Sequence, residues 1–190
     1  VEYLNESVYT NVSISKSGYT QVVPGQEIRY TFKDIGNNST VPLDSFYWRD
    51  TLPTDAVRLD KIITGTYSAR LNYKVVFQTN LNDTQRVLAD NLNTQKNYTL
   101  DASPAALGLA SNEYVTQVTF LFGRVPGGFK QVETPYIYCD VLSSLSHEYR
   151  FANKCDVGGM WQNQWVQATD RWVTIIYRGG PVPTLPRTGY

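Results

Sequence analysis

Apolar and polar residues alternate along several short stretches of this chain, a pattern typical of half-buried β-strands. Val8–Ser15 and Glu27–Lys33 show it first, and in the second stretch Ile28, Tyr30 and Phe32 fall on one face. Glycine, proline and asparagine separate the stretches, as they do in antiparallel sandwiches. Further strands are expected at Leu43–Asp50, Val57–Ile63, Leu71–Gln78, Tyr98–Leu100, Tyr114–Phe122, Tyr136–Leu142, Tyr149–Ala152 and Trp172–Tyr177.

The pattern predicts an all-β fold, an antiparallel Ig-like β-sandwich with little helix. Only Pro104–Leu109 is expected to form a helical turn. Residues 56–135 carry no motif that we can assign, and we interpret them as an inserted hairpin region. The sandwich domain is expected to cover residues 1–179, and residues 180–190 are expected to form an extended tail outside the core.

Composition removes several classes of function. Lys and Arg together number 17 and so do Asp and Glu, so the chain lacks the basic footprint of a nucleic-acid partner. No apolar run approaches the ~18 residues that span a bilayer. The single histidine, His147, has no second histidine to share a metal, and it is expected in a solvated loop. We therefore expect neither a metal nor a cofactor.

Two cysteines, Cys139 and Cys155, stand on either side of His147. They lack the spacing of a zinc or redox motif. If Tyr136–Leu142 and Tyr149–Asp156 form one hairpin, the two sulfurs face each other, and a disulfide could form outside the cell. The alternative is a pair of buried free thiols.

Trp161 and Trp165 flank a run of three amide side chains. Exposed tryptophans beside amides are suited to stacking on sugars, so these two residues are candidates for ligand binding. Packing in the core or at its rim is the alternative.

The last residues of the chain include a pentapeptide, Leu185, Pro186, Arg187, Thr188 and Gly189. It resembles the Leu-Pro-x-Thr-Gly sorting signal that sortase transpeptidases read on Gram-positive surface proteins. The resemblance implies cleavage between Thr188 and Gly189 and transfer of the Thr188 carboxyl to an amine of the cell-wall peptidoglycan or of a pilus subunit. In that family an apolar span and a basic tail follow the signal, so we expect this chain to be a fragment of a longer protein.

A second resemblance covers about the first 55 residues. The strand around Lys16, the run Val23–Tyr30 and the corner Asp50-Thr51-Leu52-Pro53 resemble the conserved repeat domain of Gram-positive surface proteins. Related sandwiches of the collagen-adhesin class join a lysine and an asparagine side chain by an isopeptide bond, with help from a carboxylic acid. The order of residues implies Lys16 and Asn153 as the linked pair and Asp50 as the acid.

Formation of such a bond needs a neutral amine and a protonated acid. Burial among aromatic rings disfavours charge, so Lys16 would become a neutral nucleophile and Asp50 would stay protonated. The alternative hypothesis is that Lys16, Asp50 and Asn153 are ordinary strand and turn residues.

These observations predict a non-enzymatic, extracellular surface protein that a sortase attaches to the Gram-positive cell wall: the wall-proximal stalk domain of an adhesin, or a minor or basal pilin. The alternative function is a ligand-binding adhesin module that recognises host glycan or matrix protein. Autocatalytic isopeptide formation would be the only chemistry, and it would occur once in each chain.

Overall fold

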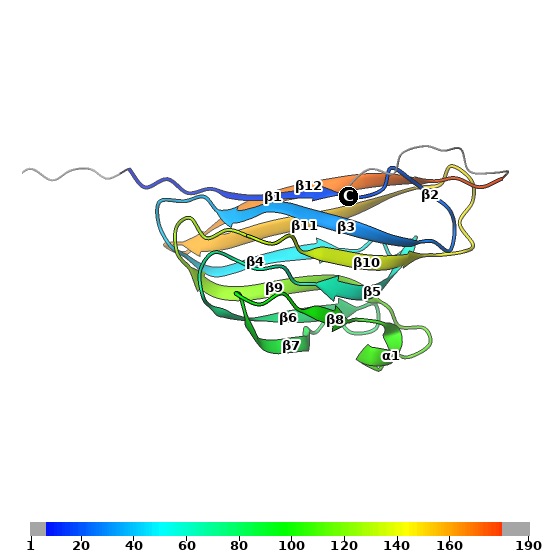
Figure 1. Ribbon diagram of the computed structural model, residues 1–190, viewed down its shortest axis with the longest axis horizontal. Coiled ribbons are helices and arrows are strands. Elements are labelled where there is room, and N and C mark those ends of the chain that lie inside the picture. The colour runs from blue at the N-terminus through cyan, green and yellow to red at the C-terminus, as the bar shows by residue number, and fades with distance from the viewer. Residues whose placement is uncertain (1–6, 180–190) are drawn as a thin grey trace, which may run out of the picture.

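The computed structural model describes residues 7–179 as a sandwich of two β-sheets with almost no helix (Figure 1). One sheet has five strands in the order β1-β3-β10-β5-β8, and the other has seven in the order β2-β12-β11-β4-β9-β6-β7. The strands are β1 (Val12–Ser17), β2 (Gln21–Val22), β3 (Glu27–Asn37), β4 (Leu43–Thr51), β5 (Val57–Ile63), β6 (Asn72–Thr79), β7 (Arg86–Asn93), β8 (Thr99–Asp101), β9 (Val115–Val125), β10 (Tyr136–Val141), β11 (Arg150–Trp161) and β12 (Gln164–Ile176).

The predicted all-β sandwich is therefore confirmed, and so is the small amount of helix. The one helix among residues 7–179 is α1 (Pro104–Leu107), which is too short to cross a membrane. Ser103 caps the N-terminus of this helix, and its hydroxyl accepts a hydrogen bond from the Ala106 N–H. Pro104 occupies the first turn of the helix, where the backbone N–H would have no helical partner, so the missing N–H costs nothing.

Alternation builds the core. Every second residue of β1 is buried, and the inward residues of β4 include Trp48 and Asp50, both with no exposed surface. Trp48 stacks on Phe120 with ring centroids 4.1 Å apart, and its indole N–H donates to the Tyr67 hydroxyl at 3.1 Å. This aromatic layer lies between the two sheets, beside the buried carboxylate of Asp50.

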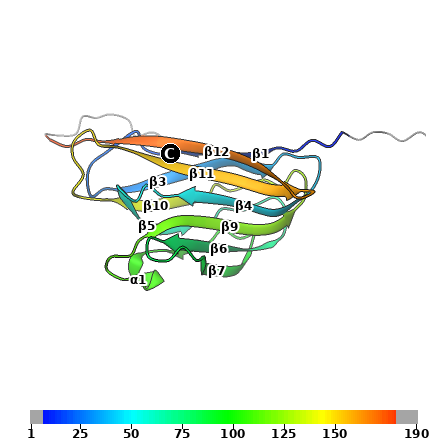
Figure 2. The same cartoon turned by 180° about the vertical axis from the view of Figure 1, so that it is seen from behind.

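The region that the sequence left unassigned belongs to the sandwich itself. β5 joins the five-stranded sheet next to β10, whereas β9, β6 and β7 extend the seven-stranded sheet beyond β4. Figure 2 shows β9, β6 and β7 in turn below β12, β11 and β4. The insertion therefore widens both sheets, and of its strands only β6 and β7 form a sequential hairpin.

β11 and β12 form a long hairpin, and Gln162 and Asn163 form its turn. Both residues have positive φ, 48° and 64°, which is the backbone of a two-residue type I′ turn and matches the strand twist. Sequence analysis predicted only the outer ends of these strands. It missed the centre because Gly158 and Gly159 interrupt the apolar pattern.

The predicted cysteine hairpin is wrong. Cys139 lies on β10 in the five-stranded sheet, and Cys155 lies on β11 in the other sheet. The segment between the two strands crosses from one layer to the other, so it does not fold back within a sheet. Both cysteines are buried free thiols.

Candidate functional site

Three polar side chains meet in the core between the sheets. The Lys16 Nζ atom lies 3.0 Å from Asp50 Oδ1, and the Asn153 side-chain amide donates to Asp50 Oδ2 at 3.3 Å. Lys16 is 3% exposed, and Asp50 and Asn153 are fully buried. The structure thus brings together the three residues that the sequence order had linked.

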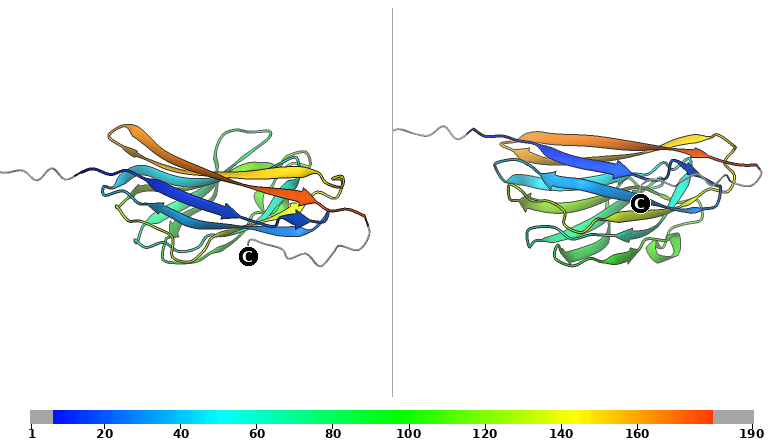
Figure 3. Two further views of the ribbon diagram at one scale, coloured as in Figure 1. Left: turned by 90° about the horizontal axis from the view of Figure 1, so that it is seen from above. Right: turned by 45° about the horizontal axis from the view of Figure 1, so that its top comes forward.

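Strand geometry explains why they meet. Lys16 is an inward residue of β1 at the edge of the five-stranded sheet, while Asp50 and Asn153 point inward from neighbouring strands of the other sheet. Asp50 is directly opposite Cys155, so Asn153 is its diagonal neighbour on the same face. At this edge β1 runs beside β12 (Figure 3), and the Lys16 backbone N–H donates to Asp170 at 2.7 Å.

Aromatic rings enclose the lysine. Its Nζ atom lies 4.1 Å from the ring centroids of both Tyr30 and Phe32, which are inward residues of β3. Phe32 in turn contacts Trp48, with ring centroids 4.8 Å apart. This enclosure excludes water from the Lys16–Asp50 pair, and an ion pair buried in such surroundings suffers a large desolvation cost.

Burial shifts both groups toward their neutral forms. Desolvation lowers the pKa of Lys16, and the negative charge of Asp50 opposes this shift. Desolvation also raises the pKa of Asp50, against the opposing effect of Lys16. The pair therefore tends toward a neutral amine beside a protonated acid.

Asn153 has one unsatisfied atom. Among the described residues its carbonyl oxygen has no hydrogen-bond partner, although it is buried. An orphaned buried acceptor of this kind costs about 1–3 kcal/mol. Rotating the amide by half a turn would instead place the oxygen toward Asp50, where a protonated carboxyl can donate to it. An amine, an acid and an electrophilic amide carbon then share one dry space.

The two thiols belong to the same buried region. Lys16 interacts electrostatically with Cys139 and with Cys155. Burial raises the pKa of Cys139 well above its usual value and that of Cys155 to about 12. Both groups are therefore protonated at neutral pH and are poor nucleophiles.

We expect iodoacetamide to leave both cysteines unmodified in the folded protein at pH 7, because the thiols are buried and protonated. Unfolding without a reductant should expose two reactive thiols per chain, counted by mass. A label on the native protein would contradict the burial argument. No label after unfolding would instead indicate a disulfide.

The two tryptophans do not form a single stacking platform. Trp161 pairs with Gln164 and Trp165 with Met160, so the indoles project from opposite faces of the hairpin. Trp161 packs against the core, whereas Trp165 is 51% exposed. Only Trp165 remains available to a ligand on the outer face.

The other predicted features have simple outcomes. His147 accepts a hydrogen bond from the Arg178 backbone N–H at 2.8 Å and lies near the surface. Within residues 7–179 no group of acidic, cysteine or histidine side chains could hold a metal. The pentapeptide at residues 185–189 lies outside the described part of the chain.

Comparison with known proteins gives only distant structural likenesses. No family and no curated protein matches the sequence. One similar structure is the collagen-binding subdomain of the Enterococcus faecalis surface protein ACE, at 11% identity over 87% of this chain and 96% of the other, with a TM-score of 0.40. A putative membrane-anchored protein of Corynebacterium diphtheriae is 14% identical over 97% of this chain and 39% of its own, with a TM-score of 0.44.

A third similar structure is the collagen-binding domain of a Staphylococcus aureus adhesin, at 10% identity. It covers 92% of this chain and 100% of the other, with a TM-score of 0.34. The fold is thus distantly similar to domains of bacterial surface proteins, and the evidence on function lies in the chain's own residues.

Proposed function

We propose that this chain is an extracellular stalk or pilin domain of a wall-anchored bacterial surface protein, locked by an isopeptide bond between Lys16 and Asn153. The observation that carries the proposal is the buried contact of Lys16 and Asn153 with one carboxyl group, Asp50. Burying a lysine side chain in a protein core costs free energy, and lysines are almost never buried unless they are paired. The burial of Lys16 therefore supports a functional role for this residue.

The reaction needs no cofactor. The neutral Lys16 amine attacks the Asn153 side-chain carbon while protonated Asp50 donates to the carbonyl oxygen. Collapse of the tetrahedral intermediate breaks the bond to the amide nitrogen, which leaves as ammonia after taking up the proton that the amine gives up. Asp50 regains its proton and is unchanged. Fixed proximity in a site without water supplies most of the rate.

The product would stabilise the domain by restricting its unfolded state. Joining residue 16 to residue 153 closes most of the chain into one covalent loop. The loop-entropy relation used for disulfides gives about 5 kcal/mol for a loop of this size. An amide would also resist reducing agents, which a disulfide does not.

Intact mass spectrometry tests the bond directly. A linked chain weighs one ammonia less than its sequence, and since both cysteines are free, no further loss of hydrogen is expected. A chain of full sequence mass would refute the cross-link.

Anchoring is the second part of the proposal and rests on the pentapeptide at Leu185–Gly189. We expect a sortase of matching specificity to join an amine nucleophile to Thr188 and to release the residues after it. Thr188→Ala should abolish the transfer, while Thr184→Ala, which changes a threonine outside the pentapeptide, should not. Failure of transfer under conditions that process a control peptide would contradict a working signal.

A further inference from the structure

Two neighbouring cations on the outer face of the seven-stranded sheet have no partner in the part of the chain that the structure describes. Lys154 on β11 and Arg171 on β12 are directly opposite each other in the ladder, and both are exposed. Within residues 7–179 neither forms an ion pair or a side-chain hydrogen bond. Like charges at directly opposed positions destabilise a sheet, so this pair costs stability.

The cations line a hollow of about 710 Å³, which also includes Thr51, Gln167 and Thr169. Its two carboxylates are already engaged. Asp156 accepts from Arg49 at 3.0 and 2.6 Å, and Asp170 accepts the Lys16 backbone N–H at 2.7 Å. If Arg49, the partner of Asp156, is counted with Lys154 and Arg171, three positive charges and two negative charges surround the hollow. This excess of positive charge favours an anionic ligand.

Two aromatic rings, the buried Tyr47 and the exposed Trp165, lie beside the hollow on the same face. Tyr47 lies across Gly158, where a Cβ atom would come within 2.9 Å of the Tyr47 ring. The Tyr47 hydroxyl donates to Asp156 at 2.7 Å and accepts from Gln167 at 3.0 Å, which fixes the ring. The half-exposed Trp165 ring meets the edge of Tyr47, with centroids 6.0 Å apart. A side chain at position 158 would therefore displace the Tyr47 ring from this position.

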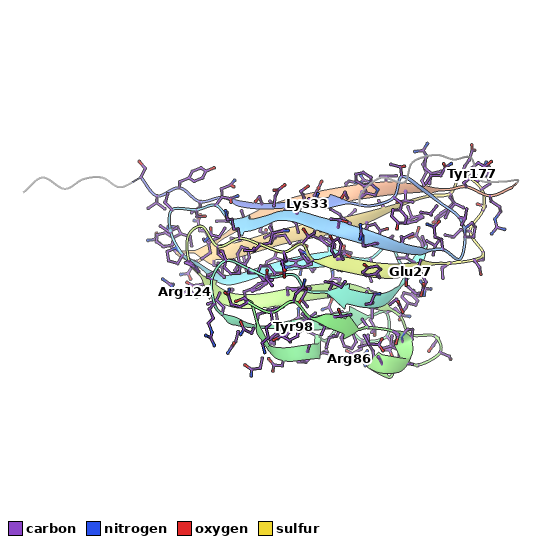
Figure 4. All side chains as sticks on the ribbon, in the orientation of Figure 1. Glu27, Lys33, Arg86, Tyr98, Arg124 and Tyr177 are labelled. Carbon is purple, nitrogen blue, oxygen red and sulfur yellow. The ribbon has the colours of Figure 1, made fainter. Side chains whose placement is uncertain are left out.

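The spacing suits an extended ligand. Trp165, Gln167, Thr169 and Arg171 are alternate outward residues of β12, so the backbone positions of Trp165 and Arg171 are about 20 Å apart at ~3.4 Å per residue. Figure 2 views this face, with β12, β11 and β4 side by side. In contrast, Glu27 at the start of β3 and Lys33 in its second half place charges of both signs on the other sheet (Figure 4).

We propose that this face binds an acidic polysaccharide, with one sugar ring stacked on Trp165 and the sulfate or carboxylate groups of sugars further along the polysaccharide held by Lys154 and Arg171. Lys154 stands on β11, whose backbone groups are paired on both sides, to β12 and β4, so a peptide lying over Lys154 could not add to the sheet there. This face offers instead an aromatic ring, an amide, hydroxyls and two cations, which are the groups that bind sugars and their anions.

The test uses isothermal titration of the whole chain with a size-defined heparin oligosaccharide. A neutral oligosaccharide of the same length and polyglutamate serve as comparison probes. We expect the sulfated sugar to bind more tightly than either, with an affinity that falls as salt rises. Equal binding of the neutral sugar would overturn the role of the cations, and equal binding of polyglutamate would overturn the assignment to a sugar.

Variants separate binding from folding. Lys154→Gln with Arg171→Gln should weaken binding by about tenfold or more, whereas Arg70→Gln with Lys96→Gln, an equal charge change on exposed loop residues, should not. The first variant should melt no lower than the parent, because it relieves the opposed charges. Trp165→Ala should weaken binding as well. Unchanged affinity in either the Lys154/Arg171 variant or the Trp165 variant would overturn the proposal.

Discussion

Replacing Asp50 with alanine is expected to give a chain of full sequence mass that unfolds far more easily than the parent. Without the carboxyl group nothing polarises the Asn153 carbonyl, so the ammonia is retained. The variant loses the cross-link, worth about 5 kcal/mol by the loop-entropy relation. It also leaves Lys16 buried without its partner, since the contact of 3.0 Å is gone. Intact mass and thermal unfolding measure the two effects.

Two further variants sharpen this experiment. Asp50→Asn preserves the shape of the side chain but cannot carry the proton, so it too should remain unlinked. Asp44→Ala removes an exposed carboxylate from the same strand, where it pairs with Arg124 at 2.9 Å, and should link normally and melt close to the parent. A linked Asp50→Ala chain would show that the acid is dispensable and that the assigned role is wrong.

The second large effect is expected at Phe32. Phe32→Ala opens the aromatic enclosure of Lys16, whose Nζ atom lies 4.1 Å from the Phe32 ring centroid. Water then reaches the amine, its pKa rises toward the ordinary value, and at pH 7 it stays protonated and unreactive. We expect slow or incomplete linking, together with a loss of about 3–5 kcal/mol from the cavity alone.

Two measurements distinguish the loss of amine activation from the loss of core packing. Phe32→Leu keeps the site apolar, so most chains should still link even though the core is weakened. Raising the pH should recover part of the rate in Phe32→Ala, since more of the amine is then neutral. A Phe32→Ala chain that links as fast as the parent at pH 7 would mean that burial by this ring is not what activates Lys16.

Sequence patterns were sufficient for the architecture wherever one face of a strand is buried. The alternation of Ile28, Tyr30 and Phe32 predicted β3, and in the structure two of these residues surround Lys16. The same rule failed in the centre of the β11–β12 hairpin. There Gly158 is buried by the side chain of Tyr47, a tertiary contact that no local period reveals.

The candidate site could be predicted in part for a similar reason. The order of Lys16, Asp50 and Asn153 suggested a link through resemblance, but their contact depends on the packing of two sheets. The cysteines show the limit of arguing from neighbouring segments, because consecutive strands can lie in different layers. β10 and β11 do so, and Cys139 and Cys155 therefore belong to opposite sheets.

The division of the site between the sheets has a consequence for biogenesis. Lys16 belongs to β1, and Asn153 belongs to β11, which is synthesised only after the nine strands between them. The amine and the amide meet in a dry space only after the sheets have packed in register, so a misfolded chain cannot acquire the bond. Loss of ammonia is irreversible once the gas or ion has diffused away. Each linked molecule therefore keeps a permanent chemical record that it reached its native state at least once, even if it is later denatured.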